Sequence, residues 1–227
     1  MHKTYFVSGI DTGIGKTLAT GLMLRHLVRR GVDAITVKLV QTGNVGRSED
    51  IEEHRRIAGD ISFPEDGEGL TAPQVFAYPS SPLLAAAREG RTVDLDRISD
   101  AVRLCEARRE AVLVESAGGL LVPLARNVLS ADFAAERGWP LILVTCGRLG
   151  AINHTLLSLE AAATRHIPIA GIVYNDFPET AAPLADDAKA AIMERLAAAG
   201  RPRAFAEIPV FNLAGPFPDV DFTEIFQ

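Results

Sequence analysis

Short apolar runs alternate with amphipathic stretches along most of this chain, and this alternation limits its possible folds more than any other feature. The runs are rich in Val and Ile and lack the apolar/polar alternation of a one-sided sheet, so both faces of the expected sheet are buried. The stretches between them have the apolar spacing of helices. We therefore predict an α/β fold with a mainly parallel sheet and helices on both faces. The expected strands are 5–8, 34–40, 111–115, 141–145 and 169–174, and the expected helices are 18–30, 94–108, 153–165 and 186–199.

Two stretches lack this regularity. Residues 59–78 contain several prolines and glycines in a polar context, which indicates a long loop with a function or with local disorder. Residues 211–227 are expected to form an irregular C-terminal tail. The chain of 227 residues has no internal repeat, and its hydrophobic content of 48% is enough for one sizeable core. We therefore expect a single domain over residues 1–227.

Composition excludes several classes of protein. The chain has 23 Lys and Arg against 29 Asp and Glu, a net charge of −6, which argues against a general nucleic-acid binder. It has no apolar run of about 18 residues, so no membrane partner is expected, and its first residues lack the apolar core of a signal peptide. Cys105 and Cys146 are too few for a disulfide scaffold or a four-cysteine zinc site. We expect a reduced, cytoplasmic protein.

The first expected strand leads into a glycine-rich loop and then directly into a helix. The loop reads Ser-Gly-Ile-Asp-Thr-Gly-Ile-Gly-Lys-Thr over residues 8–17, with one residue more between its outer glycines than is usual. Strand, loop and helix in this order are typical of a phosphate-binding P-loop, in which backbone N–H groups surround an anion, so we predict a P-loop NTPase type of fold. Lys16 is expected to reach the β- and γ-phosphates and Thr17 to hold Mg²⁺. A glycine turn with a chance Gly-Lys-Thr is the alternative.

Four further side chains are expected near this loop. A lysine at a strand end, such as Lys38, is by itself more often solvated, but its place at the edge that holds the P-loop favours a second cation for phosphoryl transfer. Thr42 then offers a hydroxyl to a substrate. Glu115, after four apolar residues, is suited to a second Mg²⁺ contact, with a turn cap as the alternative. Asp50, at the start of a helix, fits a helix cap and a metal ligand equally well.

The fourth and fifth expected strands also end in polar segments. A glycine turn precedes the helix after the fourth strand, and the free N–H groups of residues 150–153 suit a substrate carboxylate. Asn175 follows the fifth strand, where its amide can pair with the edge of a base. His154 and Cys146 have no partner for a metal site or a nucleophilic pair and are interpreted as structural.

Taken together, the ordered motifs resemble the dethiobiotin synthetase family, the ATP-dependent enzymes that close the ureido ring in biotin synthesis. The matching segments are 9–17, Lys38 with 42–43, 48–50, 114–119, 149–154, 175–176 and 207–209. The resemblance implies a homodimer that uses ATP and Mg²⁺ to convert diaminopelargonate (7,8-diaminononanoate) and CO₂ or bicarbonate into dethiobiotin, ADP and phosphate. A carbamate and a carbamic-phosphoric anhydride would be the intermediates.

The resemblance also implies a role for each matching residue. Lys16 and Lys38 would be catalytic, and Thr17, Asp50 and Glu115 would surround the metal. The substrate would be bound by Thr12, Lys38, Thr42, Gly150, Ala151, Ile152 and Asn153. The nucleotide would be bound by Gly13, Ile14, Gly15, Lys16, Thr17, Leu18, Asp50, Glu115, Ser116, Ala117, Gly118, Asn175, Asp176, Pro209 and Val210.

The chain departs from the family at three positions. Ser116 stands where the family usually has glycine, and Leu39 stands where it often has proline. Leu83 follows a Ser-Pro pair, where the family often has histidine. The Ser116 side chain is expected beside the phosphate site, where it would shift nucleotide affinity. One alternative is a nucleotide switch of the kind that positions chromosomes or division sites, but Asp11 stands where such proteins carry a second lysine. Another is a related P-loop ligase acting on a different carboxylic acid.

Overall fold

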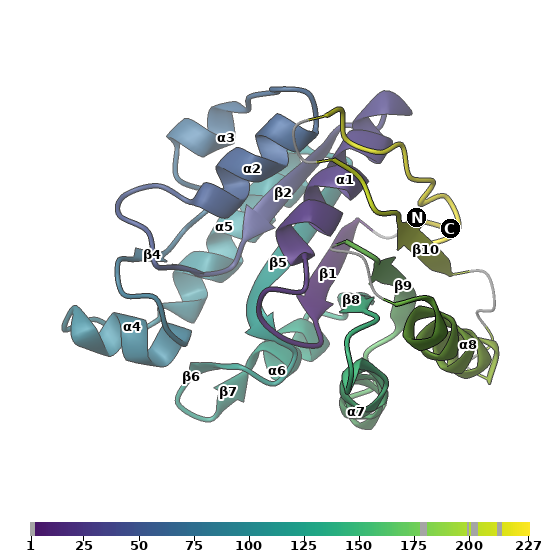
Figure 1. Cartoon of the computed structure of the whole chain (residues 1–227). Coiled ribbons are helices and arrows are strands. Elements are labelled where there is room, and N and C mark those ends of the chain that lie inside the picture. The colour runs from purple at the N-terminus through teal and green to yellow at the C-terminus, as the bar shows by residue number, and fades with distance from the viewer. Residues whose placement is uncertain (1–2, 178–180, 199, 201–203, 213–214) are drawn as a thin grey trace.

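A six-stranded parallel sheet forms the centre of the computed structural model, which describes residues 3–177, 181–198, 200, 204–212 and 215–227 (Figure 1). Every neighbouring pair of strands is parallel. In sheet order the strands are β10 (Phe205–Ile208), β9 (Ile169–Asn175), β8 (Leu141–Cys146), β1 (Thr4–Gly9), β5 (Ala111–Gly119) and β2 (Ala34–Lys38).

All five expected strands are present, and two of them end more than one residue away from the expected end. β2 ends at Lys38 instead of continuing to Val40, and β5 continues through the glycines to Gly119. The β10 strand was not predicted, because it is four residues long and lies at the edge of the sheet with Glu207 exposed. The central strands β1, β5 and β8 are buried on both faces, as their unbroken apolar sequence predicts.

Helices cover both faces of the sheet. Crossovers between parallel strands are right-handed, so the direction of a crossover along the sheet decides the face on which its helix lies. α1 leads from β1 toward the β2 edge and lies on one face, whereas the helices from residue 95 onward lead back toward the β10 edge and lie on the other. α2 packs against α1 (Figure 1). The first face has α1 (Lys16–Arg29) and α2 (Glu49–Ile57), and the second has α5 (Leu95–Arg108), α6 (Ser130–Glu136), α7 (Ala151–Thr164) and α8 (Ala182–Ala198). The expected end of α8, Ala199, lies outside the described residues.

The stretch from 59 to 78 is held in place by ion pairs. It contains α3 (Pro64–Gly67) and β4 (Val75–Phe76), and β4 pairs with β3 (Gln41–Thr42). Glu65 is buried and accepts two hydrogen bonds from Arg109. Asp66 likewise forms two hydrogen bonds with Arg55. The expected loop is therefore an ordered segment, followed by α4 (Pro82–Arg88).

A small hairpin and the C-terminal tail complete the fold. β6 (Pro123–Ala125) and β7 (Val128–Leu129) are antiparallel and follow β5. The described residues after β10 form neither helix nor strand, as predicted. The tail nevertheless closes the core, since Phe222 and Ile225 are buried and Phe226 places its ring edge-on to Tyr5 with 5.1 Å between the ring centres.

Two exclusions made from composition can be compared with the structure. In the part of the chain that the structure describes, every helix is too short or too polar to cross a membrane. Cys105 and Cys146 are both free, so no disulfide joins them.

Candidate active site

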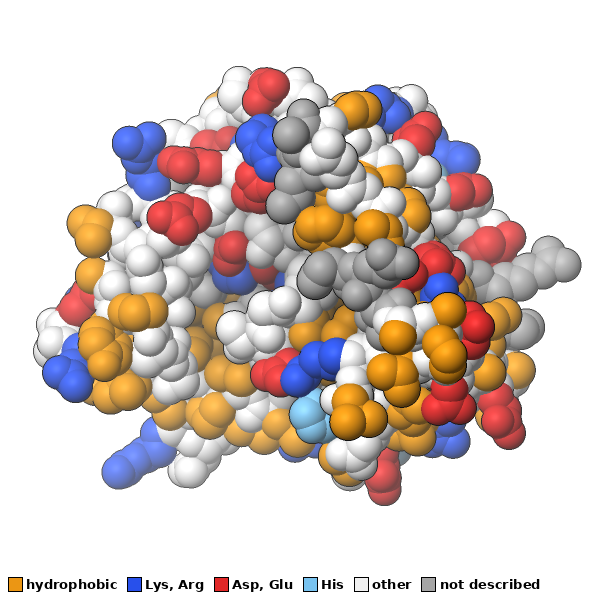
Figure 2. All heavy atoms as spheres, in the orientation of Figure 1, with side chains coloured by type: hydrophobic (Ala, Val, Ile, Leu, Met, Phe, Trp, Pro, Cys, Tyr) orange, Lys and Arg blue, Asp and Glu red, His pale blue; other side chains and the backbone are white. Residues whose placement is uncertain are grey.

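A cavity of about 920 Å³ lies beyond the carboxyl ends of β1, β2 and β5. Figure 2 shows this face hollowed, with charged side chains at the base of the hollow and hydrophobic side chains below it. Ligands of open parallel sheets bind at this edge. The predicted site residues that line the cavity are Thr12, Gly13, Gly15, Lys16, Thr17, Leu18, Lys38, Thr42, Asp50, Glu115, Ala117, Gly118 and Asn175.

The glycine-rich loop between β1 and α1 has the backbone of an anion-binding loop. Gly13 and Gly15 have φ angles of 74° and 91°, a left-handed conformation that favours glycine. A Cβ atom at Gly15 would lie 2.2 Å from the amide nitrogen of Asn175, so only glycine fits there. α1 begins at Lys16 with no side-chain cap, which leaves its first N–H groups directed at the cavity.

Lys16 is held inside this loop. Its ammonium group donates a hydrogen bond of 2.8 Å to the carbonyl of Asp11. Burial lowers the pKa of Lys16 to about 8, against the opposing attraction of Glu115. A partly desolvated lysine at the start of a helix attracts an anion strongly, because the anion replaces the lost hydration.

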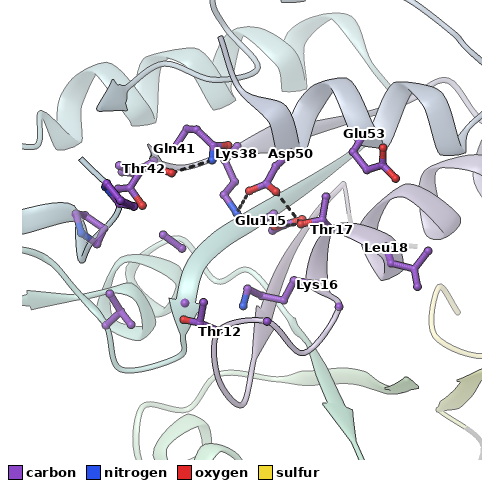
Figure 3. A pocket seen from close by; sticks show the side chains of 18 of the residues that line it. Thr12, Lys16, Thr17, Leu18, Lys38, Gln41, Thr42, Asp50, Glu53 and Glu115 are labelled. Carbon is purple, nitrogen blue, oxygen red and sulfur yellow. Dashed lines mark hydrogen bonds and ion pairs between the residues drawn. The ribbon is translucent and has the colours of Figure 1, made fainter. Parts of the chain in front are cut away.

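Lys38 lies between two carboxylates at the base of the cavity. Its Nζ is 2.6 Å from Asp50 Oδ2 and 2.7 Å from Glu115 Oε1 (Figure 3). Lys38 and Glu115 are direct neighbours in the β2–β5 register. Burial by itself would lower the pKa of Lys38, but Glu115 and Asp50 raise it above its ordinary value. Lys38 is only 5% exposed, so its interpretation as a solvated strand end is wrong.

Asp50 is not the cap of its helix. Ser48 is the N-cap of α2, and its hydroxyl accepts a hydrogen bond of 3.2 Å from the N–H of Ile51. The Asp50 carboxylate instead points to the P-loop, where Thr17 Oγ1 donates to its Oδ1 at 2.8 Å (Figure 3).

Glu115 is completely buried, and both of its oxygens have partners. Oε1 accepts from Lys38 and lies 3.5 Å from Thr17 Oγ1, and Oε2 lies 2.9 Å from His54 Nε2. Burial would raise the pKa of Glu115, but the neighbouring Lys38 and His54 lower it well below its ordinary value. The carboxylate is therefore ionised, and the interpretation of Glu115 as a turn cap does not describe these contacts.

The side chains beside the P-loop suit a Mg²⁺ ion that is shared with phosphate and water better than a metal ion bound by protein ligands alone. Within the described ranges, no three His, Cys, Asp or Glu side chains form a group that could hold a metal ion. Two carboxylates and the Thr17 hydroxyl converge on one point beside the P-loop. Mg²⁺ in phosphate sites is usually bound by one or two carboxylates together with phosphate oxygens and water, which this set allows.

Two predicted residues, Ile14 of the P-loop and Ser116 of β5, have buried side chains. The Ile14 side chain is buried in the core, and its carbonyl accepts a hydrogen bond of 3.0 Å from the Asn175 amide. Ser116 is also buried, and its hydroxyl donates to Ser8 Oγ at 2.9 Å. The expectation that Ser116 places a side chain beside the phosphate site is therefore wrong, because residues alternate in direction along β5 and Glu115 takes the cavity side.

Other predicted residues lie outside the lining of this cavity. Asp176 interacts with Lys189 at 3.8 Å, and Pro209 and Val210 follow β10. The segment 150–153 forms the start of α7, with Gly150 at a φ of 88°. The turn before α7 is joined to the P-loop by an ion pair between Arg148 and Asp11.

The cavity also has walls that were not predicted. Gln41 and Glu53 line it, and the segment 79–82 closes one side before α4. Phe177 and Phe217 line the end near Asn175, and Phe211 packs between them with ring centres at 4.8 and 6.0 Å. The Ser-Pro pair at 81–82 is a signal for the start of a helix, and this signal could have indicated that the segment 79–82 leads into one. The aromatic residues give no such signal, since they are far apart in sequence.

The fold and the loop define a P-loop NTPase type of protein. A ParA family ATPase from Chlorobium tepidum TLS superposes with a TM-score of 0.55 at 15% identity, covering 93% of this chain and 86% of that one. Chloroplast FtsY from Physcomitrella patens has a TM-score of 0.52 at 14% identity, covering 99% and 64%. Identity this low shows the fold alone. The family model described as "AAA domain" matches residues 3–215.

Comparison of sequences gives the particular family. The chain is 46% identical to the ATP-dependent dethiobiotin synthetase of Chlorobaculum tepidum over 207 residues, which cover 91% of this chain and 85% of that protein. It is also 46% identical to one from Haemophilus influenzae, over 79% of this chain and 94% of that protein. The chain belongs to the ATP-dependent dethiobiotin synthetase family.

Proposed function

We propose that this chain forms dethiobiotin from diaminopelargonate, CO₂ and ATP, with Mg²⁺. One amine adds to CO₂ and loses a proton to give a carbamate, and a carbamate oxygen takes the γ-phosphoryl group, which releases ADP. The second amine then attacks the carbonyl carbon, and the bond from that carbon to the phosphate oxygen breaks. Besides family membership, the observation that supports this proposal is a buried Lys38 that shares one cavity with the P-loop.

The two lysines are suited to different parts of this reaction. Lys16, at the start of α1, binds the β- and γ-phosphates together with the loop N–H groups. Lys38 faces the other side of the same space and stabilises negative charge on the carbamate and on the transferring phosphoryl group. Because Asp50 and Glu115 already hold the Lys38 ammonium group in place, it needs little rearrangement when that charge develops. Thr12 and Thr42, which line the cavity, orient the diamine.

Thr17, Asp50 and Glu115 would hold Mg²⁺. When bound, the ion would neutralise charge on the phosphate oxygens. At the other end of the cavity, Asn175 binds the nucleotide base. Phe177 and Phe217, which line the cavity, give that base an apolar surface. Asp176, Pro209 and Val210 lie outside the lining and would contact the base only from its edge.

We further propose that the chain is a homodimer and that residues 150–153 receive the substrate carboxylate. The Gly150 cap has no side chain to bond the first N–H groups of α7. The Ala151 N–H donates to the Arg148 carbonyl, so the N–H groups of Ile152 and Asn153 would receive the carboxylate. Large apolar side chains near this start are exposed, with Leu149 at 86% and Leu157 at 55%, as is usual for a surface that another protein covers.

The proposal is tested by ATP hydrolysis in the presence of bicarbonate and a panel of substrates. A dethiobiotin synthetase should release phosphate only when diaminopelargonate is present, and dethiobiotin should form in equal amount. A monoamine analogue that lacks the second amine is the matched control, since it can form the carbamate but cannot close the ring. Phosphate release that ignores the diamine would contradict the proposal and favour a nucleotide switch.

A further inference from the structure

His54 is a fully buried histidine beside the candidate active site. It lies on α2 one turn after Asp50, is 0% exposed, and does not line the cavity. Its Nε2 is 2.9 Å from Glu115 Oε2, and its Nδ1 is 3.0 Å from Thr36 Oγ1. His54 therefore cannot touch a substrate, but it contacts a carboxylate that faces one.

The direction of these hydrogen bonds follows from Arg55 and from the ionised Glu115. An arginine can only donate, and Arg55 Nη1 donates to Thr36 Oγ1 at 2.7 Å. The Thr36 hydroxyl has one proton of its own, which is then free to point at His54 Nδ1. The ionised Glu115 carboxylate can only accept, so His54 Nε2 holds the proton that is donated to Oε2. With Nε2 protonated and the Thr36 proton directed at the ring, Nδ1 accepts.

This chain of hydrogen bonds is anchored in the segment 59–78. Arg55 forms a two-point contact with Asp66 on α3, at 2.9 Å through Nε and 2.8 Å through Nη2. The Thr71 hydroxyl donates to Asp66 Oδ1 at 2.7 Å. A continuous path of polar contacts thus runs from α3 through Arg55, Thr36 and His54 to Glu115.

The consequence is that the two oxygens of Glu115 are no longer equivalent. Oε2 is occupied by His54, so the carboxylate cannot rotate freely, and Oε1 is directed at Lys38 and Thr17. We propose that His54 is a positioning residue, which fixes Glu115 so that one oxygen faces the divalent cation of the ATP complex. This inference rests on the proposed role of Glu115 in binding Mg²⁺.

A matched set of variants separates this role from simple filling of the core. His54→Leu keeps the volume and removes both nitrogens, whereas in His54→Gln the side-chain amide can reach the position of Nε2 and donate to Glu115. Thr36→Val removes the hydroxyl that orients His54. His26→Leu is the control, because His26 lies on α1 against Phe222 and away from the cavity.

The measurement is binding of Mn²⁺ to the protein in the presence of ADP, followed by electron paramagnetic resonance, beside the Mg²⁺ dependence of dethiobiotin formation. Loss of a residue that orients a metal ligand typically weakens metal binding by about 10–100-fold, which we expect for His54→Leu. His54→Gln should recover most of the affinity, and the control should bind as the wild type does.

Two results would overturn the proposal. One is wild-type Mn²⁺ affinity in a folded His54→Leu, and the other is a folded His54→Gln that binds as weakly as His54→Leu. If His54→Leu does not fold, wild-type affinity in Thr36→Val decides against the proposal and weakened affinity decides for it. Binding of Mn²⁺ with ADP needs no diamine, so a failure of the proposed reaction would be recognised separately.

Discussion

Replacing Lys38 by Met should destabilise the protein strongly at neutral pH. Methionine keeps most of the length of the apolar stem and removes the charge that Asp50 and Glu115 share. Glu115 is completely buried, so its charge would lose its closest cation with no water to replace it. Breaking a buried ion pair by removing one partner typically costs about 3–5 kcal/mol of unfolding free energy. At about 2–4 °C per kcal/mol for a chain of this size, the expected fall in Tm is about 6–20 °C.

The loss should also depend on pH in a defined direction. The pKa of Glu115 lies below its ordinary value of 4.5 in the folded protein, where Lys38 and His54 counteract the effect of burial. A carboxyl group whose pKa is lowered by folding contributes stability above its unfolded pKa, and this contribution is lost as the pH falls. Lys38→Met removes the share of this stability that comes from the attraction between Lys38 and Glu115. The difference in unfolding free energy between wild type and variant should therefore shrink below about pH 4.

Urea unfolding of both proteins at neutral and acidic pH measures this difference. Lys189→Met is the matched control, because Lys189 also contacts two carboxylates, Glu207 at 2.6 Å and Asp176 at 3.8 Å, but its side chain is 21% exposed and that of Glu207 40%. Exposed pairs contribute about 0–1 kcal/mol, so the control should lose little. The reasoning is refuted if Lys38→Met loses no more than the control, or if its loss is the same at both pH values.

Three further predictions concern the nucleotide and its metal. Asp50→Asn and Glu115→Gln should each raise the Mg²⁺ concentration for half-maximal dethiobiotin formation, since an amide keeps the shape of a carboxylate and removes its charge. Ser48 and not Asp50 is the cap of α2, so an Asp50→Asn variant with an unchanged Mg²⁺ requirement would contradict the role of Asp50 as a metal ligand. Lys16→Ala should lower turnover by about 10²–10³-fold with an unchanged circular dichroism spectrum, and normal turnover would exclude its role in phosphate transfer. Burial lowers the pKa of Lys16 to about 8, so the free protein loses the Lys16 charge above that pH. Calorimetry should therefore find weaker ATP binding above about pH 8, and an affinity that stays constant would show that the Lys16 charge does not contribute to ATP binding.

Much of the fold and the centre of the site could be predicted because both depend on local patterns. Unbroken apolar runs indicate buried parallel strands, and the carboxyl ends of such strands meet at one edge, which brings Lys38 and Glu115 to the P-loop. The β10 strand escaped prediction because four residues at the edge of a sheet, with a glutamate among them, are too few to show a strand pattern.

The role of His54 could not be predicted for a different reason. Its place one turn after Asp50 is that of any residue on an amphipathic helix, and its partners come from two strands and depend on the β2–β5 register. The wall formed by Phe177 and Phe217 depends in the same way on how the irregular tail returns to the sheet. Such contacts are set by tertiary packing, which periodicity and motif spacing do not describe.

The buried charges at the base of the cavity are best understood through the reaction. A buried ion pair is weak evidence for stability, since apolar residues of similar volume often stabilise a fold as well or better. Lys38, Glu115 and His54 are all buried here, and every polar side-chain atom among them has a partner. An arrangement of this kind holds a cation in a fixed position where charge develops, at a point where water would otherwise have to reorganise. The path through Arg55 to Asp66 connects the segment 59–78 to the same group of side chains.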